Sequence, residues 1–234
     1  MSAPARQGRL AAAAFWVLWA MVRAGLRLCC RLRIEGPLPP AGACVLAANH
    51  VSLLDPIVLG AALPRRIVYL MTTTFYRSRS MGWFYRWNQA IAISARGGNR
   101  EALRAARGAL AAGRTIGIFP EGGISRDGLP MLGSPGAVAL VLHAGVPIVP
   151  IGLVGTDDAL PFGGRWPRFR RITVRFGEPL TAAELSGDTG ERRQVLQQAT
   201  NRIMDRIATL CGHRSRAGEL AASSDGAASG QPAR

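Results

Sequence analysis

Short, continuous apolar segments alternate with segments of helical character along most of the chain, and this alternation constrains the fold more than any other feature. The segments expected to be strands are 43–48, 66–71, 90–93, 115–119, 146–153 and 172–176, the last with the polar–apolar alternation of a half-exposed edge strand. The segments expected to be helices are 57–63, 101–112, 135–144 and 191–210. This order predicts a single α/β domain whose central sheet is mixed, largely parallel and flanked by helices.

The first 33 residues form a separate apolar and basic segment. The run Leu10–Val22 is continuously apolar but only 13 residues long, against the ~20 residues that cross a bilayer. Arg23, Arg27 and Arg31 follow at four-residue spacing and would share one helical face. We predict a membrane-associated helix that dips into one leaflet, with tryptophans at the interface and arginines among the headgroups. A cleaved signal peptide and a buried core helix are the alternatives.

Composition divides the rest of the chain into a core domain, 34–211, and a tail, 212–234. The tail consists mainly of Ala, Ser, Gly and Arg, so it is expected to be disordered. The four cysteines have no metal-ligand spacing, which predicts no metal site and indicates a reducing environment.

The chain is strongly basic, with a net charge of +15, and all 29 of its basic residues are arginines. Such a charge indicates an anionic partner: lipid headgroups, a phosphorylated substrate, an acidic carrier protein or nucleic acid. The aromatic and basic segment 75–87 suits a nucleic acid or a membrane interface equally well. Because the arginines are spread along the chain and no nucleic-acid-binding motif is present, we do not expect a nucleic acid partner.

The predicted strand-to-helix junction at 49–56 carries a histidine and an aspartate. A neutral imidazole accepts a proton near pH 7, and a nearby carboxylate can fix its tautomer. The five-residue spacing brings the two together if a helix starts between them, with Ser52 as N-cap and Asp55 at the third helical position pointing back towards His50. The same residues also make a plain helix start: a cap, an acid matched to the helix dipole and a tolerated proline. The local pattern leaves both interpretations open.

Four motifs follow one another between residues 49 and 150. They are Asn49-His50 with Asp55, the loop residue Arg96, Phe119-Pro120-Glu121-Gly122, and the apolar strand Val146-Pro147-Ile148-Val149-Pro150. In this order they resemble the signature of the PlsC-like glycerolipid acyltransferases, the lysophosphatidic acid acyltransferase family. The resemblance implies that residues 34–211 are an acyltransferase domain.

The resemblance implies transfer of a fatty acyl group to a lysophospholipid hydroxyl, with 1-acylglycerol-3-phosphate as the first expectation. The donor would be acyl-CoA or an acyl-carrier protein, acting as a substrate, and no bound cofactor is expected. His50 would be the general base and Asp55 would orient it. The residues expected to bind substrate are Asn49, Ser52, Arg96, Phe119, Pro120, Glu121, Gly122 and Arg126.

Arginines are expected to hold the acceptor's phosphate, with Arg96 as the principal clamp. The family often continues its Phe-Pro-Glu-Gly motif with Thr-Arg-Ser, whereas this chain has Gly123-Ile124-Ser125. Arg126, two residues beyond Ile124, is expected to supply the missing charge.

The partners implied are a lysophospholipid, an acyl thioester, an anionic membrane surface and an acidic acyl-carrier protein. They imply a peripheral or monotopic enzyme on the cytoplasmic face of the inner (plasma) membrane. An acyltransferase for another lysophospholipid is the nearest alternative. A lipid hydrolase, in which water replaces the lipid hydroxyl, and a non-enzymatic protein that binds nucleic acid or membrane are alternatives of other classes.

Overall fold

The fold is described from a computed structural model that covers residues 3–79, 82–94, 99–186 and 191–213. Within these residues seven strands form one sheet, in the order β1-β7-β6-β2-β5-β3-β4. The strands are β1 (Arg33–Glu35), β2 (Cys44–Ala48), β3 (Ile67–Thr72), β4 (Ile91–Ile93), β5 (Thr115–Ile118), β6 (Ile148–Val154) and β7 (Thr173–Phe176). All neighbouring strands are parallel except β6 and β7, which are antiparallel, so the predicted mixed and largely parallel sheet is confirmed.

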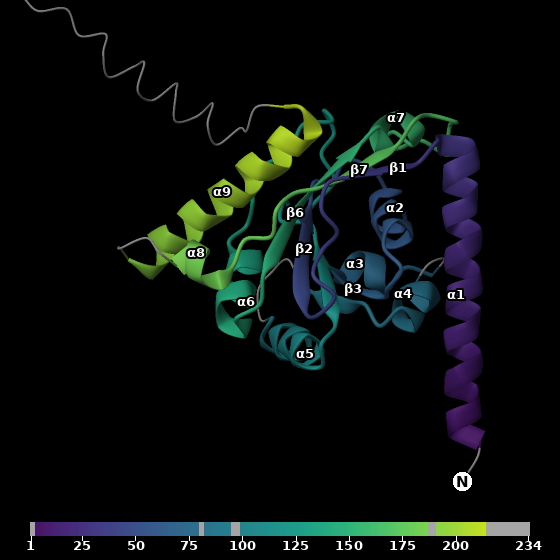
Figure 1. Ribbon diagram of the computed structural model, residues 1–234, viewed down its shortest axis with the longest axis horizontal. Coiled ribbons are helices and arrows are strands. Elements are labelled where there is room, and N and C mark those ends of the chain that lie inside the picture. Colours follow the sequence, from purple (N-terminus) through teal and green to yellow (C-terminus); the bar gives the residue numbers. More distant parts are fainter. Residues whose placement is uncertain (1–2, 80–81, 95–98, 187–190, 214–234) are drawn as a thin grey trace, which may run out of the picture.

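Helices cover both faces of the sheet. They are α1 (Ala3–Cys30), α2 (Asp55–Ala62), α3 (Thr73–Tyr76), α4 (Gly82–Trp87), α5 (Arg100–Ala111), α6 (Gly136–Ala144), α7 (Thr156–Ala159), α8 (Ala182–Ser186) and α9 (Arg192–Cys211). Figure 1 shows α1 along one side of the molecule and α8 and α9 on the opposite side. The four helices predicted from the sequence are all present, with ends that differ by one or two residues.

The central strand β2 explains why the molecule has two hydrophobic cores. Val45 and Ala47 pack into a cluster with α5, α6 and α9, whereas Cys44, Leu46 and Ala48 pack into a cluster with α1 and α2. All five residues are fully buried. Because successive side chains point to opposite faces and both faces are covered, β2 is apolar at every position.

One glycine allows α9 to lie close against the sheet. A Cβ atom on Gly152 of β6 would lie 2.7 Å from the Cβ atom of Leu210, near the end of α9. Side-chain atoms do not approach so closely, so any larger residue would push the end of α9 away from the sheet.

The strand at 172–176 is not the edge strand that its alternation predicts. β1 pairs with its outer side, from Arg33↔Thr173 to Glu35↔Arg175, and therefore forms the edge. Two of the three residues of β1 are charged, so this strand has no apolar signal in the sequence. The predicted domain boundary between residues 33 and 34 falls inside β1. Of the predicted tail, all but residues 212 and 213 lies outside the described residues.

Helix α1 is 28 residues long, more than twice the apolar run from which it was predicted. It contains one window, Ala13–Cys30, that is long and apolar enough to cross a membrane by length and composition. These two properties are a weak argument by themselves, because core helices and signal sequences share them. Only 6% of the window is buried, however, which is not the environment of a core helix.

Two side chains that were predicted to face the membrane attach α1 to α2 instead. The indole nitrogen of Trp19 donates to the carbonyl oxygens of Gly60 and Leu63, at 3.0 and 2.9 Å. The guanidinium of Arg23 donates to the two carbonyl oxygens between them, at 2.5 and 3.0 Å. These carbonyls lie at the C-terminal end of α2, where they have no partner inside the helix and where the dipole favours a cation. Helix α1 is therefore fixed to the domain at its middle.

Candidate active site

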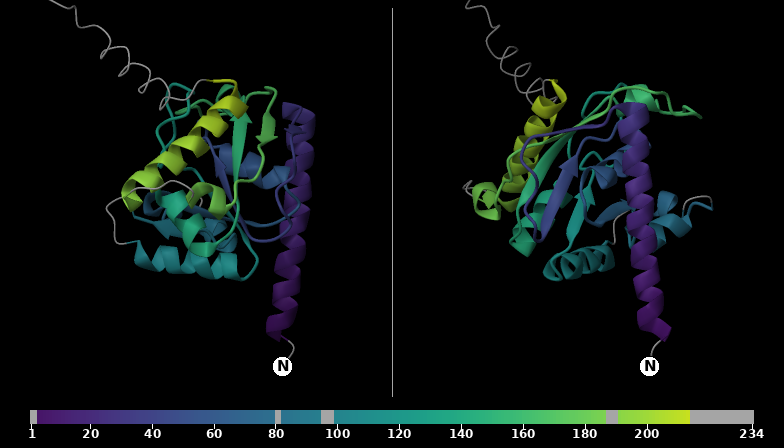
Figure 2. Two further views of the ribbon diagram at one scale, coloured as in Figure 1. Left: turned by 60° about the vertical axis from the view of Figure 1, so that its left-hand side comes forward. Right: turned by 45° about the vertical axis from the view of Figure 1, so that its right-hand side comes forward.

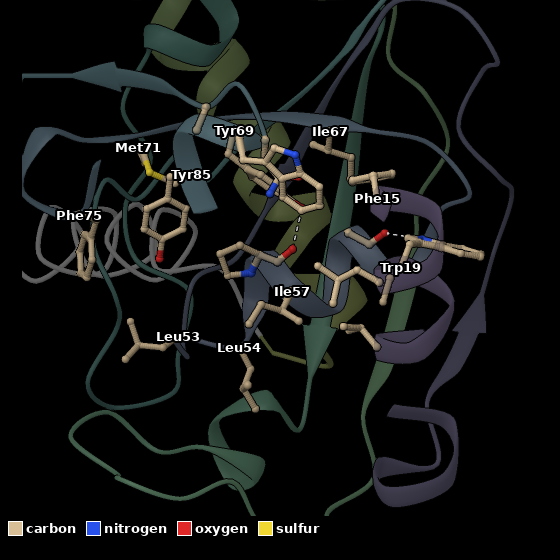
Figure 3. Close-up of a pocket in the computed structure, with 18 of the residues that line it drawn as sticks. Phe15, Trp19, Leu53, Leu54, Ile57, Ile67, Tyr69, Met71, Phe75 and Tyr85 are labelled. Atoms are coloured by element: carbon tan, nitrogen blue, oxygen red, sulfur yellow. Dashed lines mark hydrogen bonds between the residues drawn. The ribbon is translucent and has the colours of Figure 1, made fainter. Parts of the chain in front are cut away.

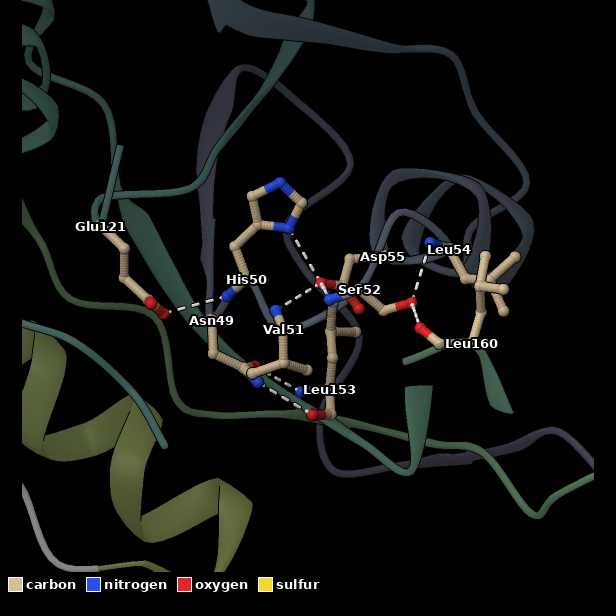
Figure 4. Close-up of polar contacts among 9 residues, drawn as sticks. All are labelled: Asn49, His50, Val51, Ser52, Leu54, Asp55, Glu121, Leu153 and Leu160. Carbon is tan, nitrogen blue, oxygen red and sulfur yellow. Dashed lines mark hydrogen bonds and ion pairs between the residues drawn. The ribbon is translucent and has the colours of Figure 1, made fainter. Parts of the chain in front are cut away.

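The predicted junction lies at the C-terminal end of β2, beside the loop that follows β5 (Figure 4). Because β2 and β5 are parallel neighbours, the chain leaves both strands at the same edge of the sheet. The backbone N–H of His50 donates to Glu121 Oε1 at 2.9 Å, and the N–H of Ser125 donates to the carbonyl oxygen of His50 at 2.7 Å. Both backbone groups of His50 are thus held by the loop after β5.

One carboxylate oxygen organises the turn between β2 and α2. Asp55 Oδ2 accepts hydrogen bonds from the backbone N–H groups of Val51 and Ser52, at 2.7 and 2.8 Å, and lies 2.9 Å from His50 Nδ1. Asp55 is fully buried, whereas 14% of the His50 side chain is exposed. The contact expected between His50 and Asp55 is therefore present. With a carboxylate as partner, Nδ1 carries the proton and Nε2 keeps a free lone pair.

The start of α2 differs from the predicted cap. The helix begins at Asp55, three residues beyond Ser52, and its N-cap residue, Leu54, makes no side-chain capping bond. Ser52 Oγ accepts from the N–H of Leu54, while Asp55 reaches back to the N–H of Ser52. The acid at the helix start thus stabilises the preceding turn, which carries His50.

A stack of aromatic rings supports the imidazole of His50. The imidazole lies 4.2 Å from the ring of Phe119, nearly parallel to it, and Phe119 is in turn parallel to Tyr69 at 6.3 Å. The hydroxyl of Tyr69 donates to the carbonyl oxygen of Pro56 at 2.7 Å. Burial and, secondarily, the Asp55 carboxylate raise the pKa of Tyr69, so this donor stays protonated.

Tyr69 was not among the predicted site residues. It pairs across the sheet with Gly117 of β5, and a Cβ atom on that glycine would lie 2.7 Å from the Tyr69 ring. Gly117 therefore leaves the space in which Tyr69 stacks on Phe119. A glycine within an apolar strand was the only signal of this close approach in the sequence.

Two of the predicted substrate-binding residues are buried and hydrogen-bonded to backbone groups. Asn49 is almost fully buried, and its side-chain amide makes two hydrogen bonds with the backbone of Leu153 in β6, at 2.9 and 2.7 Å. Ser52 is fully buried, and its hydroxyl donates to the carbonyl oxygen of Leu160 at 2.7 Å. Through these backbone partners, Asn49 ties the junction to β6 and Ser52 ties it to the chain that follows β6.

The remaining predicted residues lie in the loop after β5, with one exception. The segment Phe119–Gly122 forms a tight turn, closed by the N–H of Gly122 donating to the carbonyl oxygen of Phe119, and Gly122 has a positive φ of 72°. The turn carries Pro120 and aims Glu121 at His50. Arg126 is exposed, with its guanidinium 5.4 Å from the centre of the Phe162 ring. Arg96 lies outside the described residues.

An apolar pocket of about 400 Å³ adjoins the site (Figure 3). Helix α1 contributes Phe15 and Trp19, α2 contributes Ile57, and β3 contributes Tyr69. Pro56, the neighbour of Asp55, also lines the pocket, so the pocket wall adjoins the turn that carries the His50–Asp55 pair. The pocket was not predicted, because its lining residues come from segments far apart in the sequence.

Comparison with known proteins shows the family of the chain. The model of the family described as "Acyltransferase" matches residues 30–154, more than half of the chain. A 1-acyl-sn-glycerol-3-phosphate acyltransferase of Bacillus subtilis is 25% identical over 70% of this chain and 80% of its own length. A protein of the same name from Chlamydomonas reinhardtii is 34% identical over 53% of this chain. The match covers only 38% of that protein's length.

A solved structure has the same fold. The crystal structure of PlsC, the 1-acyl-sn-glycerophosphate acyltransferase of Thermotoga maritima, superposes with a TM-score of 0.59 and covers 79% of this chain and 78% of its own, at 24% identity. The matched family segment contains His50, Asp55 and Glu121 and ends at the last residue of β6. The chain therefore belongs to the acyltransferase family, in the PlsC-like group that its motifs resemble.

Proposed function

We propose that this enzyme transfers a fatty acyl group from an acyl thioester to the free hydroxyl of 1-acyl-sn-glycerol-3-phosphate, which gives phosphatidic acid. The observation that carries the proposal is the His50–Asp55 pair beside an apolar pocket. The names of the relatives from Bacillus subtilis and Chlamydomonas reinhardtii support this acceptor.

In the proposed reaction His50 acts as general base. Its Nε2 atom, which no described residue engages in a hydrogen bond, takes the proton of the acceptor hydroxyl as the oxygen attacks the thioester carbonyl. The new C–O bond forms, the C–S bond breaks, and the departing thiolate takes the proton from the imidazolium. Asp55 holds the ring and stabilises its positive charge during the reaction. Glu121 positions His50 by accepting a hydrogen bond from the backbone N–H of His50.

The apolar pocket is proposed to receive the acyl chain that is transferred. Its lining is aliphatic and aromatic, and each methylene group moved from water into such a surface contributes about 0.8 kcal/mol. Because Pro56 and Tyr69, which line the pocket, adjoin Asp55 and the ring stack on His50, a chain bound in the pocket is proposed to place its carbonyl carbon near His50.

The phosphate of the acceptor is proposed to bind at the loop after β5. Ser125 is bonded to the backbone of His50, so the next residue, Arg126, lies within reach of a substrate at the base. Ile124 stands where the family often has an arginine, which makes Arg126 the proposed clamp in this part of the site. Arg96 stays a proposed second clamp.

Acyl-CoA and acyl-carrier protein are both proposed donors, since each presents the same thioester. Both are substrates that leave after transfer, so no bound cofactor enters the proposed reaction. The enzyme is proposed to work on the cytoplasmic face of the inner membrane, where such thioesters meet the lipid acceptor.

The decisive experiment measures phosphatidic acid formed from labelled acyl-CoA and 1-acyl-sn-glycerol-3-phosphate, with other lysophospholipids offered in parallel. His50→Ala should lower turnover by about 10²- to 10⁴-fold, the usual contribution of a general base. His143→Ala, at the exposed end of α6, is the matched control and should keep full activity. Turnover retained in His50→Ala would rule out the mechanism, and labelled free fatty acid in place of phospholipid would identify a hydrolase.

A further inference from the structure

The chain that connects α7 to β7 has an unusual surface. Over residues 160–172 it carries four arginines and no acidic residue. Residues 162–171, here called the arginine–aromatic loop, are all exposed and form no helix or strand. Trp166 and Phe169 are 82% and 81% exposed, although both are large apolar side chains. Such side chains are seldom left in water together unless they contact something else.

The loop continues the exposed face of α1. Val17, Met21 and Leu28 are exposed large apolar residues, and their spacing of four and seven places them on one face of the helix. A hollow of about 760 Å³ at the end of α1 is lined by Leu28 and neighbouring residues together with Phe169 and Arg170 of the loop. Figure 2 shows the green chain that leads into β7 extending past the same end of α1. The helix face and the loop therefore form one continuous surface.

This surface also borders the catalytic pocket. Leu160, two residues before the loop, lines the apolar pocket and accepts a hydrogen bond from Ser52. At the start of the loop, the ring of Phe162 lies under the guanidinium of Arg126. A molecule that covers the loop and the α1 face would thus lie at the entrance to the site.

We propose that the arginine–aromatic loop is a second membrane-contact site, which inserts Trp166 and Phe169 into the interface of an anionic bilayer beside α1. Tryptophan and phenylalanine rings enter the headgroup region, and arginines bind the lipid phosphates around them. An acidic protein would pair with the arginines alone, whereas a bilayer also receives the exposed apolar side chains. The loop and the α1 face together present such side chains over a longer surface than α1 does alone. Two contacts fix the tilt of the domain, which one helix cannot do. The proposal does not depend on the reaction, because it is tested by binding.

The test measures how the full-length protein binds to vesicles of neutral phosphatidylcholine, with and without about 30% of the anionic lipid phosphatidylglycerol, because each arginine near an anionic surface contributes about 1 kcal/mol. Arg165→Gln with Arg168→Gln should weaken binding to the anionic vesicles about tenfold or more and leave binding to neutral vesicles unchanged. Trp166→Ser with Phe169→Ser should weaken binding to both. The exposed aromatic side chains contribute nothing to the core, so equal thermal unfolding is expected for all variants.

Arg192→Gln with Arg193→Gln is the matched control. It removes the same charge from the exposed start of α9, on the side of the molecule opposite α1. If this control weakens binding as much as the loop variants do, net charge and not the loop is responsible, and the proposal is wrong. If the loop variants bind vesicles normally but lose activity with an acyl-carrier protein donor, the loop binds a protein partner and the proposal is wrong.

A second readout works even if α1 alone keeps the protein on the vesicle. Lipids brominated near the headgroup quench tryptophans that enter the interface, so the wild-type protein should lose more fluorescence on binding than Trp166→Phe does. Equal quenching of the two proteins would show that Trp166 stays in water and would overturn the proposal.

Discussion

Asp55 shows how one side chain serves both structure and chemistry. A buried carboxylate needs several hydrogen-bond donors, and Asp55 Oδ2 receives two from backbone and faces the imidazole of His50. The two interpretations that the sequence left open, a helix start and a catalytic pair, are therefore compatible. The backbone contacts stabilise the turn, and the same turn aims the carboxylate at the ring.

Asp55→Asn should lower kcat by about 10²- to 10⁴-fold and leave KM nearly unchanged. The amide keeps the size of the side chain but removes the charge that stabilises the imidazolium of His50. Steady-state kinetics with labelled acyl-CoA would measure the effect, and Asp205→Asn on the exposed surface of α9 is the control. A rise in KM at constant kcat would instead indicate that Asp55 acts in substrate binding.

Asn49→Ala tests the structural role assigned to that residue. The change leaves both the N–H and the carbonyl of Leu153 without their side-chain partner, and an unsatisfied buried group costs about 1–3 kcal/mol. We expect a loss of about 2–4 kcal/mol in the free energy of unfolding, measured with urea, and an unchanged KM for the acceptor. Gln197→Ala, which removes an exposed hydrogen bond on α9, should change stability little. An unchanged stability with a raised KM would restore the substrate-binding role that the sequence predicted.

At the scale of elements, the seam between α1 and α2 defines the catalytic pocket. The hydrogen bonds from Trp19 and Arg23 fix α1 over the C-terminal end of α2, and Phe15, one turn earlier, forms part of the pocket wall. Helix α1 is thus a wall of the pocket as well as the segment proposed to contact the membrane. Gly60 of α2 also lines the pocket and faces Tyr69 of β3: a Cβ atom there would lie 3.5 Å from the Tyr69 hydroxyl.

Gly60→Leu should therefore shift the choice of acyl chain towards shorter donors. The added side chain occupies part of a pocket of about 400 Å³, and each methylene group that it displaces costs about 0.8 kcal/mol of binding, or about fourfold in kcat/KM. The ratio of kcat/KM for long and short acyl-CoA measures the shift. Gly108→Leu makes the same change in helix α5, where a Cβ meets nothing within 4 Å, and should leave the ratio unaltered. The same shift in both variants would show that the acyl chain does not bind in this pocket.

At the scale of the whole molecule, the fold buries groups that titrate at alkaline pH. Burial and, secondarily, the Glu121 carboxylate raise the pKa of the Cys211 thiol from 9.0 to about 12, and burial also raises the pKa of Cys44. The folded protein therefore keeps protons that the unfolded chain releases. Since stability falls with pH wherever the unfolded state binds fewer protons, this contribution is complete below about pH 8.5 and is lost as pH rises towards the folded pKa.

The free energy of unfolding should accordingly fall above about pH 9, by about 1.4 kcal/mol per pH unit for each such group. Urea titrations at several pH values between 8 and 11, roughly the range in which unfolded thiols ionise, would measure this slope. Cys211→Ala should make the slope shallower by about 1.4 kcal/mol per pH unit, the contribution of one group. Cys29→Ala, which removes an exposed thiol, is the control and should leave the slope as it is. Equal slopes for wild type and Cys211→Ala would contradict the assignment.

Much of the fold could be predicted because its signals are local. The strands that are covered on both faces are continuous apolar runs, and the helix at 191–210 has its apolar residues in register, with Ala199, Ile203 and Ile207 buried in α9. β1 could not be predicted, because a short charged segment becomes a strand only when β7 is beside it. In the same way, α1 extends beyond its apolar run because the next turn, with Arg23, finds its partners on α2.

The sequence by itself determined the alternation of strands and helices, the family signature and the pairing of His50 with Asp55, since each depends on residues close together in the chain. Only the tertiary structure decided that Asn49 binds Leu153, 104 residues away, and that Tyr69 joins the stack on His50. The same holds for the pocket, to which α1, α2 and β3 all contribute. Periodicity and spacing describe what each segment can form, whereas the partners of a side chain are settled when distant segments pack and exclude water.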